Sequence, residues 1–280
     1  MSYYWPHMGN EIKNMVKSCP ECQTLQPAQQ KETLQPTSYD FPMHRVGADL
    51  FQLNGKHYLV MVDGYSGYPF VANLRSLTTS AIIDKLENWF FEFGFPANIR
   101  TDGGPQFRTE FHEWCENVGI NKETSSPYFP QSNGLAESAV KNMKSLLKKC
   151  DGNFPQFRKS LLIWRNTPKA TGDTPAQLLF GYTQNYGQGD LNASPFVDRD
   201  AAKERKNKES ESQERSYNKN AKDLDELLPG QRVLLRNPAS HTWDAAATIV
   251  KKRSDGRSYV AEDEEGYQSV RNRRDIRPLL

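Results

Sequence analysis

The sequence lacks the features of a membrane or secreted protein. None of its hydrophobic runs reaches 18 consecutive apolar residues, the length at which a transmembrane helix is expected, and no signal-peptide pattern follows Met1. It contains only four cysteines, and only Cys19 and Cys22 are close together, so a disulfide framework is not expected. We therefore expect a soluble, intracellular protein with no membrane partner.

A large excess of charge is also absent. Lys and Arg total 36 against 34 Asp and Glu, for a net charge of +2. This balance neither requires nor excludes a nucleic-acid partner, so any basic surface must be local. The length of 280 residues is sufficient for about two domains.

Strand-like and helix-like segments alternate in the middle of the chain. An Asn54–Gly55 turn joins the first two of three strands, which predicts an antiparallel meander. The order β-β-β-α-β-α-β-α predicts an α/β fold with a mixed five-stranded sheet. The segments are strands at 46–51, 56–63 and 69–74, a helix at 78–94, a strand at 97–102, a helix at 109–119, a strand at 120–126 and a helix that begins after the "PQSNG" turn.

The two ends of the chain have other patterns. Residues 1–35 contain a short helical segment followed by a polar, Pro-bounded stretch. After two further short helices, residues 186–227 are polar and mixed in charge, which favours a linker or an exposed helix. Residues 228–280 contain short strands separated by turns and predict a small all-β unit.

Three carboxylates stand out in the central segment. Asp49 interrupts an apolar strand, where a half-buried carboxylate must be paired or neutralised. Asp102 ends another strand before two glycines, where an aspartate can simply stabilise a turn. Glu137 lies near a helix start, where it can simply complement the helix dipole. A shared site for divalent cations would account for all three, because Mg²⁺ takes oxygen ligands and paired ions promote phosphoryl transfer.

The helix with Glu137 also has two interpretations. Lys141 and Lys144 follow Glu137 at i+4 and i+7, and a surface ion pair of this kind contributes only about 0.2–0.5 kcal/mol. Periodicity places Lys148 on the same face. Eight Lys or Arg against two acidic residues lie between Leu135 and Lys169, which favours a phosphate backbone as the partner.

Several ordered segments together resemble the integrases of gypsy-like long-terminal-repeat retrotransposons, within the retroviral integrase superfamily. They are "GADLF", "RTDGGPQF", "SSPYFPQSNGLAES", "KSCPEC", "RNTP", "TPAQLLFGY" and the C-terminal "RSYV" and "VRNRRDIRPL", with 34 residues between Asp102 and Glu137. The resemblance implies a ribonuclease-H-like catalytic core, with Mg²⁺ or Mn²⁺ at Asp49, Asp102 and Glu137. It also implies 3′-end processing and strand transfer of DNA, and places the chain in the C-terminal part of a Pol polyprotein.

The resemblance further implies contacts with DNA. The turn before the glutamate touches the DNA end in related integrases, which implies this role for Tyr128, Gln131 and Asn133. The lysines after the glutamate act similarly there, which implies the role for Lys141, Lys144 and, on the same face, Lys148. The implied partners are the element's DNA ends and a target duplex, with a homo-oligomer on DNA in the nucleus.

The N-terminal segment departs from the family pattern. Family members bind zinc with two histidines followed by Cys-x-x-Cys, but His7 is the only histidine before Cys19 and Cys22. Two thiolates and one doubtful histidine do not complete a tetrahedral site, so we expect a vestigial segment in which zinc is unlikely.

We expect four parts: a truncated zinc-finger-like helical remnant (1–35), the catalytic core with trailing helices (42–185), a linker (186–227) and a small β-barrel (228–280). Two functions remain open: an integrase, or a host-captured or decayed derivative that binds DNA or protein without integrating. Retention of all three carboxylates favours the first, and the missing histidine pair favours the second.

Overall fold

The computed structural model describes residues 4–34, 37–124, 134–185, 197–253 and 256–279. They form two compact units. The core unit comprises the described residues from 37 to 216, and the terminal unit combines residues 4–34 with residues 217–279. Within the described residues, no helix is both long and apolar enough to cross a membrane.

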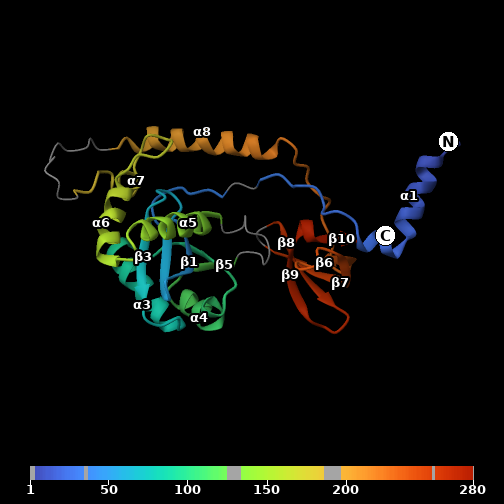
Figure 1. The fold of residues 1–280 in the computed structure, drawn as a ribbon, viewed down its shortest axis with the longest axis horizontal. Helices are drawn as coiled ribbons and strands as arrows, with labels where there is room; N and C mark the ends of the chain where they lie inside the picture. Colours follow the sequence, from blue (N-terminus) through green and yellow to red (C-terminus); the bar gives the residue numbers. More distant parts are fainter. Residues whose placement is uncertain (1–3, 35–36, 125–133, 186–196, 254–255, 280) are drawn as a thin grey trace. The chain divides into compact units, whose positions relative to one another are not determined.

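The core unit is built on a mixed five-stranded sheet of order β3-β2-β1-β4-β5 (Figure 1). The first three strands pair antiparallel, whereas β4 is parallel to both β1 and β5. Positive φ angles of 50° at Asn54 and 73° at Gly55 form the tight turn between β1 and β2. The strands are β1 (Arg45–Leu53), β2 (Lys56–Asp63), β3 (Pro69–Leu74), β4 (Asn98–Thr101) and β5 (Asn121–Thr124).

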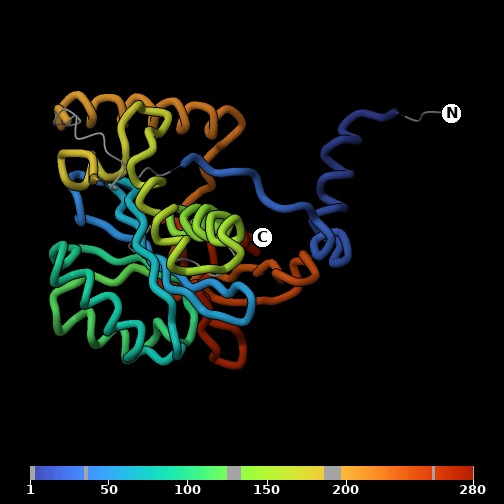
Figure 2. The backbone as a smooth tube through the Cα atoms, turned by 60° about the vertical axis from the view of Figure 1, so that its left-hand side comes forward, coloured from blue at the N-terminus to red at the C-terminus, as the bar shows by residue number. Residues whose placement is uncertain are grey.

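Helices cover both faces of this sheet, as Figure 2 shows. Because side chains alternate along a strand, Leu59 and Met61 pack with α3 and α4, while Tyr58 and Val60 pack with α5 and α6. The helices of the unit are α3 (Thr79–Phe93), α4 (Thr109–Asn117), α5 (Gly134–Lys149), α6 (Phe154–Arg165) and α7 (Pro175–Phe180). The predicted α/β fold, its strand order along the chain and its mixed sheet are confirmed.

A long polar helix, α8 (Arg199–Asn218), occupies most of the predicted linker. Ala202 is the one buried residue of α8. Because so little apolar surface is buried, α8 is attached to the core unit mainly by polar groups. The Arg205 guanidinium binds the largely buried Asp173 carboxylate, with Nη2 at 2.6 Å from Oδ1. The Lys206 ammonium donates to the carbonyl oxygens of Gly64 and Tyr65, although burial lowers its pKa to about 8.

The terminal unit holds a second five-stranded sheet, entirely antiparallel, of order β10-β6-β7-β8-β9. Its core contains Val233, Ile249, Tyr259 and Ile276. The predicted last strand is broken after Asn272 by a 3-10 turn, so that it forms β9 and β10. The elements are α1 (Met8–Ser18), α2 (Pro20–Thr24), β6 (Arg232–Arg236), β7 (Trp243–Lys252), β8 (Ser258–Asp263), β9 (Gln268–Asn272) and β10 (Ile276–Pro278).

Candidate active site

The parallel pairing of β1 and β4 brings two of the predicted carboxylates together. Gly47 on β1 is in register with Arg100 on β4. Asp49 and Asp102 each lie two residues beyond that pair, and side chains two residues apart share one face of a sheet. Both aspartates therefore occupy the same face, on neighbouring segments.

The first turn of α5 adds the third carboxylate. A Cβ atom on Gly47 would come within 3.3 Å of the Ala136 Cβ atom and 3.5 Å of its backbone nitrogen. Glycine at this position therefore lets the helix cross β1 closely, because a Cβ atom there would press on the Ala136 side chain. Glu137 follows Ala136 directly, so α5 presents it above the face that carries Asp49.

The charges of this site are poorly compensated. The pKa of Asp49 is raised from 3.8 to about 6: burial is the largest cause, the negative charges of Asp102 and Glu137 add to it, and the hydrogen bond from the Leu50 amide opposes it. The Leu50 N–H donates to Asp49 Oδ1 over 2.7 Å, and the Gly104 N–H donates to Asp102 Oδ1 over 3.0 Å. The bond from Gly104 matches the ordinary turn role of Asp102, but it leaves the mutual repulsion in place.

Three carboxylates that repel one another are a donor set suited to a hard divalent cation. In the described part of the chain, however, no three His, Cys, Asp or Glu side chains are close enough to hold one ion. The structure thus brings Asp49, Asp102 and Glu137 within electrostatic reach without closing a metal site. Their role as ligands stays a prediction.

A neutralised carboxylate lies on the same face and was missed by the sequence reasoning. Glu123 on β5 accepts from the Arg45 guanidinium on β1 and from Arg100 on β4, where Nε is 2.9 Å from Oε2. This group is saturated by two arginines, unlike the three carboxylates beside it. Charged residues at alternate positions of three predicted strands could have indicated this pairing.

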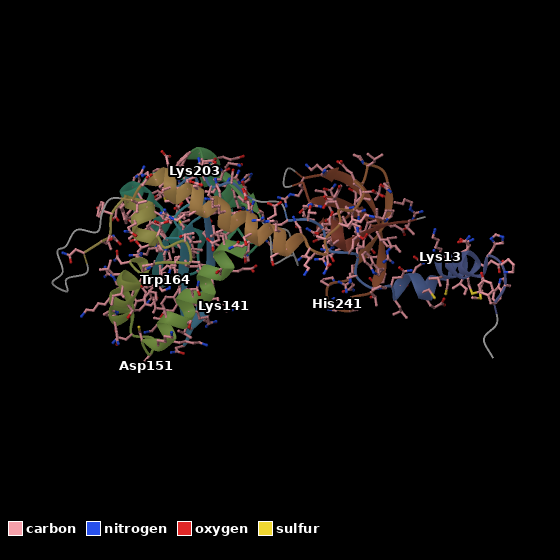
Figure 3. The ribbon with its side chains drawn as sticks, turned by 90° about the horizontal axis from the view of Figure 1, so that it is seen from above. Lys13, Lys141, Asp151, Trp164, Lys203 and His241 are labelled. Carbon is pink, nitrogen blue, oxygen red and sulfur yellow. The ribbon has the colours of Figure 1, made fainter. Side chains whose placement is uncertain are left out.

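The lysines of α5 do not form the ion pair that was one of the two interpretations of this helix. Lys141 and Lys148 are exposed and Lys144 is half-buried; Lys141 is marked on this helix in Figure 3. Among the described residues, no ion pair within 4.0 Å joins Glu137 to any of them. Tyr128, Gln131 and Asn133 lie outside the described residues.

The buried face of α5 explains this orientation. It packs Ala136, Ala139, Met143 and Leu147 against the sheet. Lys141, Lys144 and Lys148 repeat at intervals of three and four residues on a different side. Their ammonium groups therefore form a stripe that begins at Glu137.

The pKa of Asp49 gives a stability prediction for metal-free protein. Between about pH 4 and 6 the folded state keeps a proton that the unfolded state has lost, so the free energy of unfolding falls as pH rises through this window. Asp49→Asn should therefore raise that free energy above pH 6 by roughly 1 kcal/mol, less than the full shift implies because the side chain is partly solvated. Denaturant melts with a chelator at pH 4.5 and 7.5 measure this, and equal stability at pH 7.5 would contradict it.

The N-terminal thiols lie near each other but are not arranged as strong ligands. Cys22 is exposed, and a hydrogen bond with Cys19 raises its pKa, which disfavours the thiolate that binds zinc. Cys19 Sγ lies 3.3 Å from Glu21 Oε2. The other two cysteines, Cys115 and Cys150, are buried in the core unit.

Zinc content tests this segment. We expect purified protein to hold well below one zinc per chain, and a chelator to leave its melting temperature unchanged, since no folding free energy would depend on the metal. Elemental analysis and paired thermal melts measure both. Stoichiometric zinc would show the expectation wrong, and His7 would then be the first residue to replace.

Two segments of the chain match known families. Residues 42–130 match the integrase core domain, and residues 1–28 match the integrase zinc-binding domain. An uncharacterized protein of Caenorhabditis elegans is 35% identical over 187 residues, which cover 64% of this chain and 15% of that protein. The Pro-Pol polyprotein of feline foamy virus is 30% identical over 213 residues, which cover 71% of this chain and 18% of the polyprotein.

A solved structure has a similar fold. It is a chain of the simian T-cell lymphotropic virus intasome, determined in complex with PP2A regulatory subunit B56 gamma. The similarity has a TM-score of 0.65 at 19% identity and covers 97% of this chain and 91% of that one. At this identity it shows the fold alone.

The core unit is thus a ribonuclease-H-like α/β core. The chain carries the integrase core domain of the retroelement integrases, preceded by a segment that matches their zinc-binding domain. It spans 15–18% of the length of the curated relatives described above.

Proposed function

We propose that this chain is a divalent-metal-dependent integrase that trims DNA ends and joins them to a target duplex. The observation that carries the proposal is the group of three uncompensated carboxylates, Asp49, Asp102 and Glu137, beside a stripe of lysines. The 34-residue spacing of Asp102 and Glu137 supports a gypsy-like retrotransposon as the source.

Each residue has a proposed role. Asp49, Asp102 and Glu137 would hold Mg²⁺ or Mn²⁺, which when bound supplies charge stabilisation for phosphoryl transfer. Lys141, Lys144 and Lys148 would bind phosphates of the DNA end, and Tyr128, Gln131 and Asn133 would contact its terminal nucleotides. These contacts would hold the end's 3′ hydroxyl in line with a target phosphodiester.

The reaction needs no covalent enzyme intermediate. In strand transfer the 3′ oxygen forms a new bond to phosphorus and the target's own 3′ oxygen leaves, taking up a proton. The number of phosphodiester bonds is unchanged, so positioning and electrostatics are the contribution of the protein.

Assembly and location follow from the same proposal. The partners would be the element's DNA ends and a target duplex, bound by a homo-oligomer in the nucleus. In this proposal the N-terminal segment (1–35), the catalytic core (42–185), the linker (186–227) and the C-terminal sheet (228–280) would be the functional parts of the chain, although the two compact units of the described fold are drawn differently.

Strand transfer on short duplexes tests the function. We expect the purified full chain with Mn²⁺ to join labelled duplexes with recessed 3′ ends to a plasmid, and a chelator to stop the reaction. A well-folded chain that binds the duplex but never joins it would favour the host-captured or decayed alternative.

A further inference from the structure

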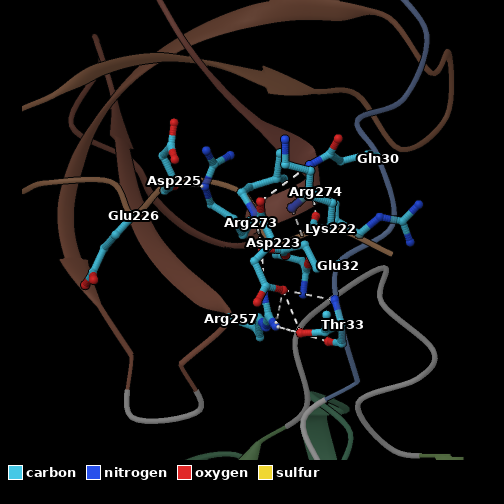
Figure 4. Close-up of polar contacts among 12 residues, drawn as sticks. Gln30, Glu32, Thr33, Lys222, Asp223, Asp225, Glu226, Arg257, Arg273 and Arg274 are labelled. Carbon is cyan, nitrogen blue, oxygen red and sulfur yellow. Dashed lines mark hydrogen bonds and ion pairs between the residues drawn. The ribbon is translucent and has the colours of Figure 1, made fainter. Parts of the chain in front are cut away.

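The terminal unit contains an extended segment that has no regular structure of its own. Residues 26–34, here called the clasp, follow α2 and run along the C-terminal part of the unit (Figure 4). Many of their polar groups form hydrogen bonds with residues that lie about 185–250 positions away in the sequence. Such a segment depends on that surface for its conformation.

The first anchor of the clasp is a buried tryptophan. Trp243 at the start of β7 is 1% exposed, and its indole N–H donates to the Gln26 carbonyl over 3.0 Å. The Arg277 guanidinium lies 4.4 Å from the centre of the Trp243 ring and donates to the Pro27 carbonyl over 3.4 Å. Without the clasp, a buried indole N–H would lose its acceptor, at a cost of about 1–3 kcal/mol.

The second anchor is the side-chain amide of Gln29. It donates to the carbonyl oxygens of Arg273 and Arg274, each at 3.3 Å, and to that of Ile276. The first two carbonyls belong to the 3-10 turn between β9 and β10, and the third belongs to the first residue of β10. A single glutamine thus bonds to the point where the last predicted strand breaks.

The third anchor is a charged cluster. Glu32 is only 6% exposed; it pairs with Arg257 and accepts from the Leu224 N–H over 3.3 Å. Arg257 also lies 2.8 Å from Asp223, whose carboxylate accepts from the Thr33 hydroxyl over 2.7 Å and the Thr33 N–H over 3.0 Å. The Thr33 hydroxyl and Arg257 lower the pKa of Asp223 to about 2.

Backbone contacts extend the clasp toward the end of α8. The Lys222 N–H donates to the Lys31 carbonyl over 2.8 Å, and the Leu34 N–H donates to the Asn218 side chain over 2.8 Å. The Lys31 ammonium lies 3.3 Å from the centre of the Tyr217 ring. Contacts along residues 26–34 therefore fix which residue of the clasp lies against which part of the surface.

We propose that this surface is a binding site for an extended peptide, and that its partner is the chain's own clasp, docked in cis. In the bound peptide, the surface selects a glutamine that faces the β9–β10 turn and, three residues later, a glutamate that pairs with Arg257. Docking couples α1 and α2 to the C-terminal sheet, so the two ends of the chain behave as one unit. This goes beyond the proposed function, which is argued from the carboxylates and lysines of the core unit.

Cysteine cross-linking in the full chain tests the partner. Because the Lys222 N–H bonds to the Lys31 carbonyl, the two Cα atoms lie about 5–6 Å apart, within disulfide range. In a chain with Cys19→Ser and Cys22→Ser, oxidised Lys31→Cys/Lys222→Cys should give a cross-linked monomer. Lys13→Cys/Lys222→Cys, with Lys13 on α1 (Figure 3), is the matched control and should link far less.

Mixing two chains that each carry only one of these cysteines shows whether the surface binds the clasp of its own chain or that of a second copy. We expect no dimer above the level given by the control. A cross-linked dimer in the mixture would overturn docking in cis and assign the surface to a second copy. The absence of any cross-link in the double-cysteine chain would overturn the binding site itself.

Hydrogen exchange tests the coupling. Glu32→Ala should speed amide exchange at Leu224 and in β8 at least about tenfold and leave β1–β3 unchanged, since local opening follows the lost contacts. Glu32→Gln, which keeps the shape, should have a smaller effect in the same strands. The control is Glu21→Ala, an exposed residue of α2; equal exchange in Glu32→Ala and this control would overturn the coupling.

Discussion

Replacing Asp102 with asparagine is expected to abolish strand transfer while the fold stays intact. Asparagine keeps the Oδ1 acceptor for the Gly104 N–H, so the turn after β4 should survive. It removes one negative ligand from the three-carboxylate site, and a lost ligand should cost at least about 100-fold in activity, the upper range seen for residues that only support ligands. Gel assays of joined products and thermal melts measure the two effects.

The matched control is Asp84→Asn. Asp84 is an exposed carboxylate on α3, on the opposite face of the sheet from the three carboxylates, so the same chemical change should leave strand transfer unaltered. Near-normal joining by Asp102→Asn would remove this residue from the catalytic group. An equal loss in both variants would point to a general defect of the preparation.

Replacing Lys141 and Lys144 together with alanine is expected to weaken DNA binding and barely change stability. No ion pair with Glu137 is formed within the described residues, so the change in free energy of unfolding should stay within about 0.5 kcal/mol. If each ammonium neutralises one phosphate, the slope of log K against log salt concentration should flatten by roughly two units. Affinity should fall for all DNA sequences tested.

Lys85→Ala/Lys149→Ala is the control with equal loss of charge. Lys85 is exposed on α3, and Lys149 is exposed on α5 outside the stripe that begins at Glu137. A salt titration of binding compares the two double variants. An unchanged slope in Lys141→Ala/Lys144→Ala would contradict phosphate contacts by these lysines, and an equal change in the control would show a non-specific charge effect.

Local patterns were sufficient to predict the core fold. The Asn54–Gly55 turn, the continuous apolar run of β2 and the helical repeats in α3 and α5 all act within a few residues of one another. The break between β9 and β10 was not predicted, because it depends on Asn272, whose side chain accepts from the Arg274 N–H at the start of the 3-10 turn. The clasp was not predicted either, since its partners lie far away in the sequence.

The candidate residues of the site could be picked out in the sequence, but their arrangement could not. Asp49 and Asp102 become neighbours only through the parallel register of β1 and β4, which no local pattern specifies. The absence of a side chain at Gly47 favours the close approach of α5, but this role is visible only once the helix is placed. The pairing of Glu123 with two arginines likewise needs three strands in register.

Location of bound Mn²⁺ tests the central claim most directly. Crystals of the full chain soaked with Mn²⁺ should show anomalous difference peaks within coordination distance of Asp49 and Asp102, with Glu137 drawn toward them. The peaks should disappear in Asp102→Asn crystals and persist in Asp84→Asn crystals. Ordered Mn²⁺ bound only elsewhere, with no peak near Asp49 and Asp102 at saturating metal, would contradict a three-carboxylate metal site.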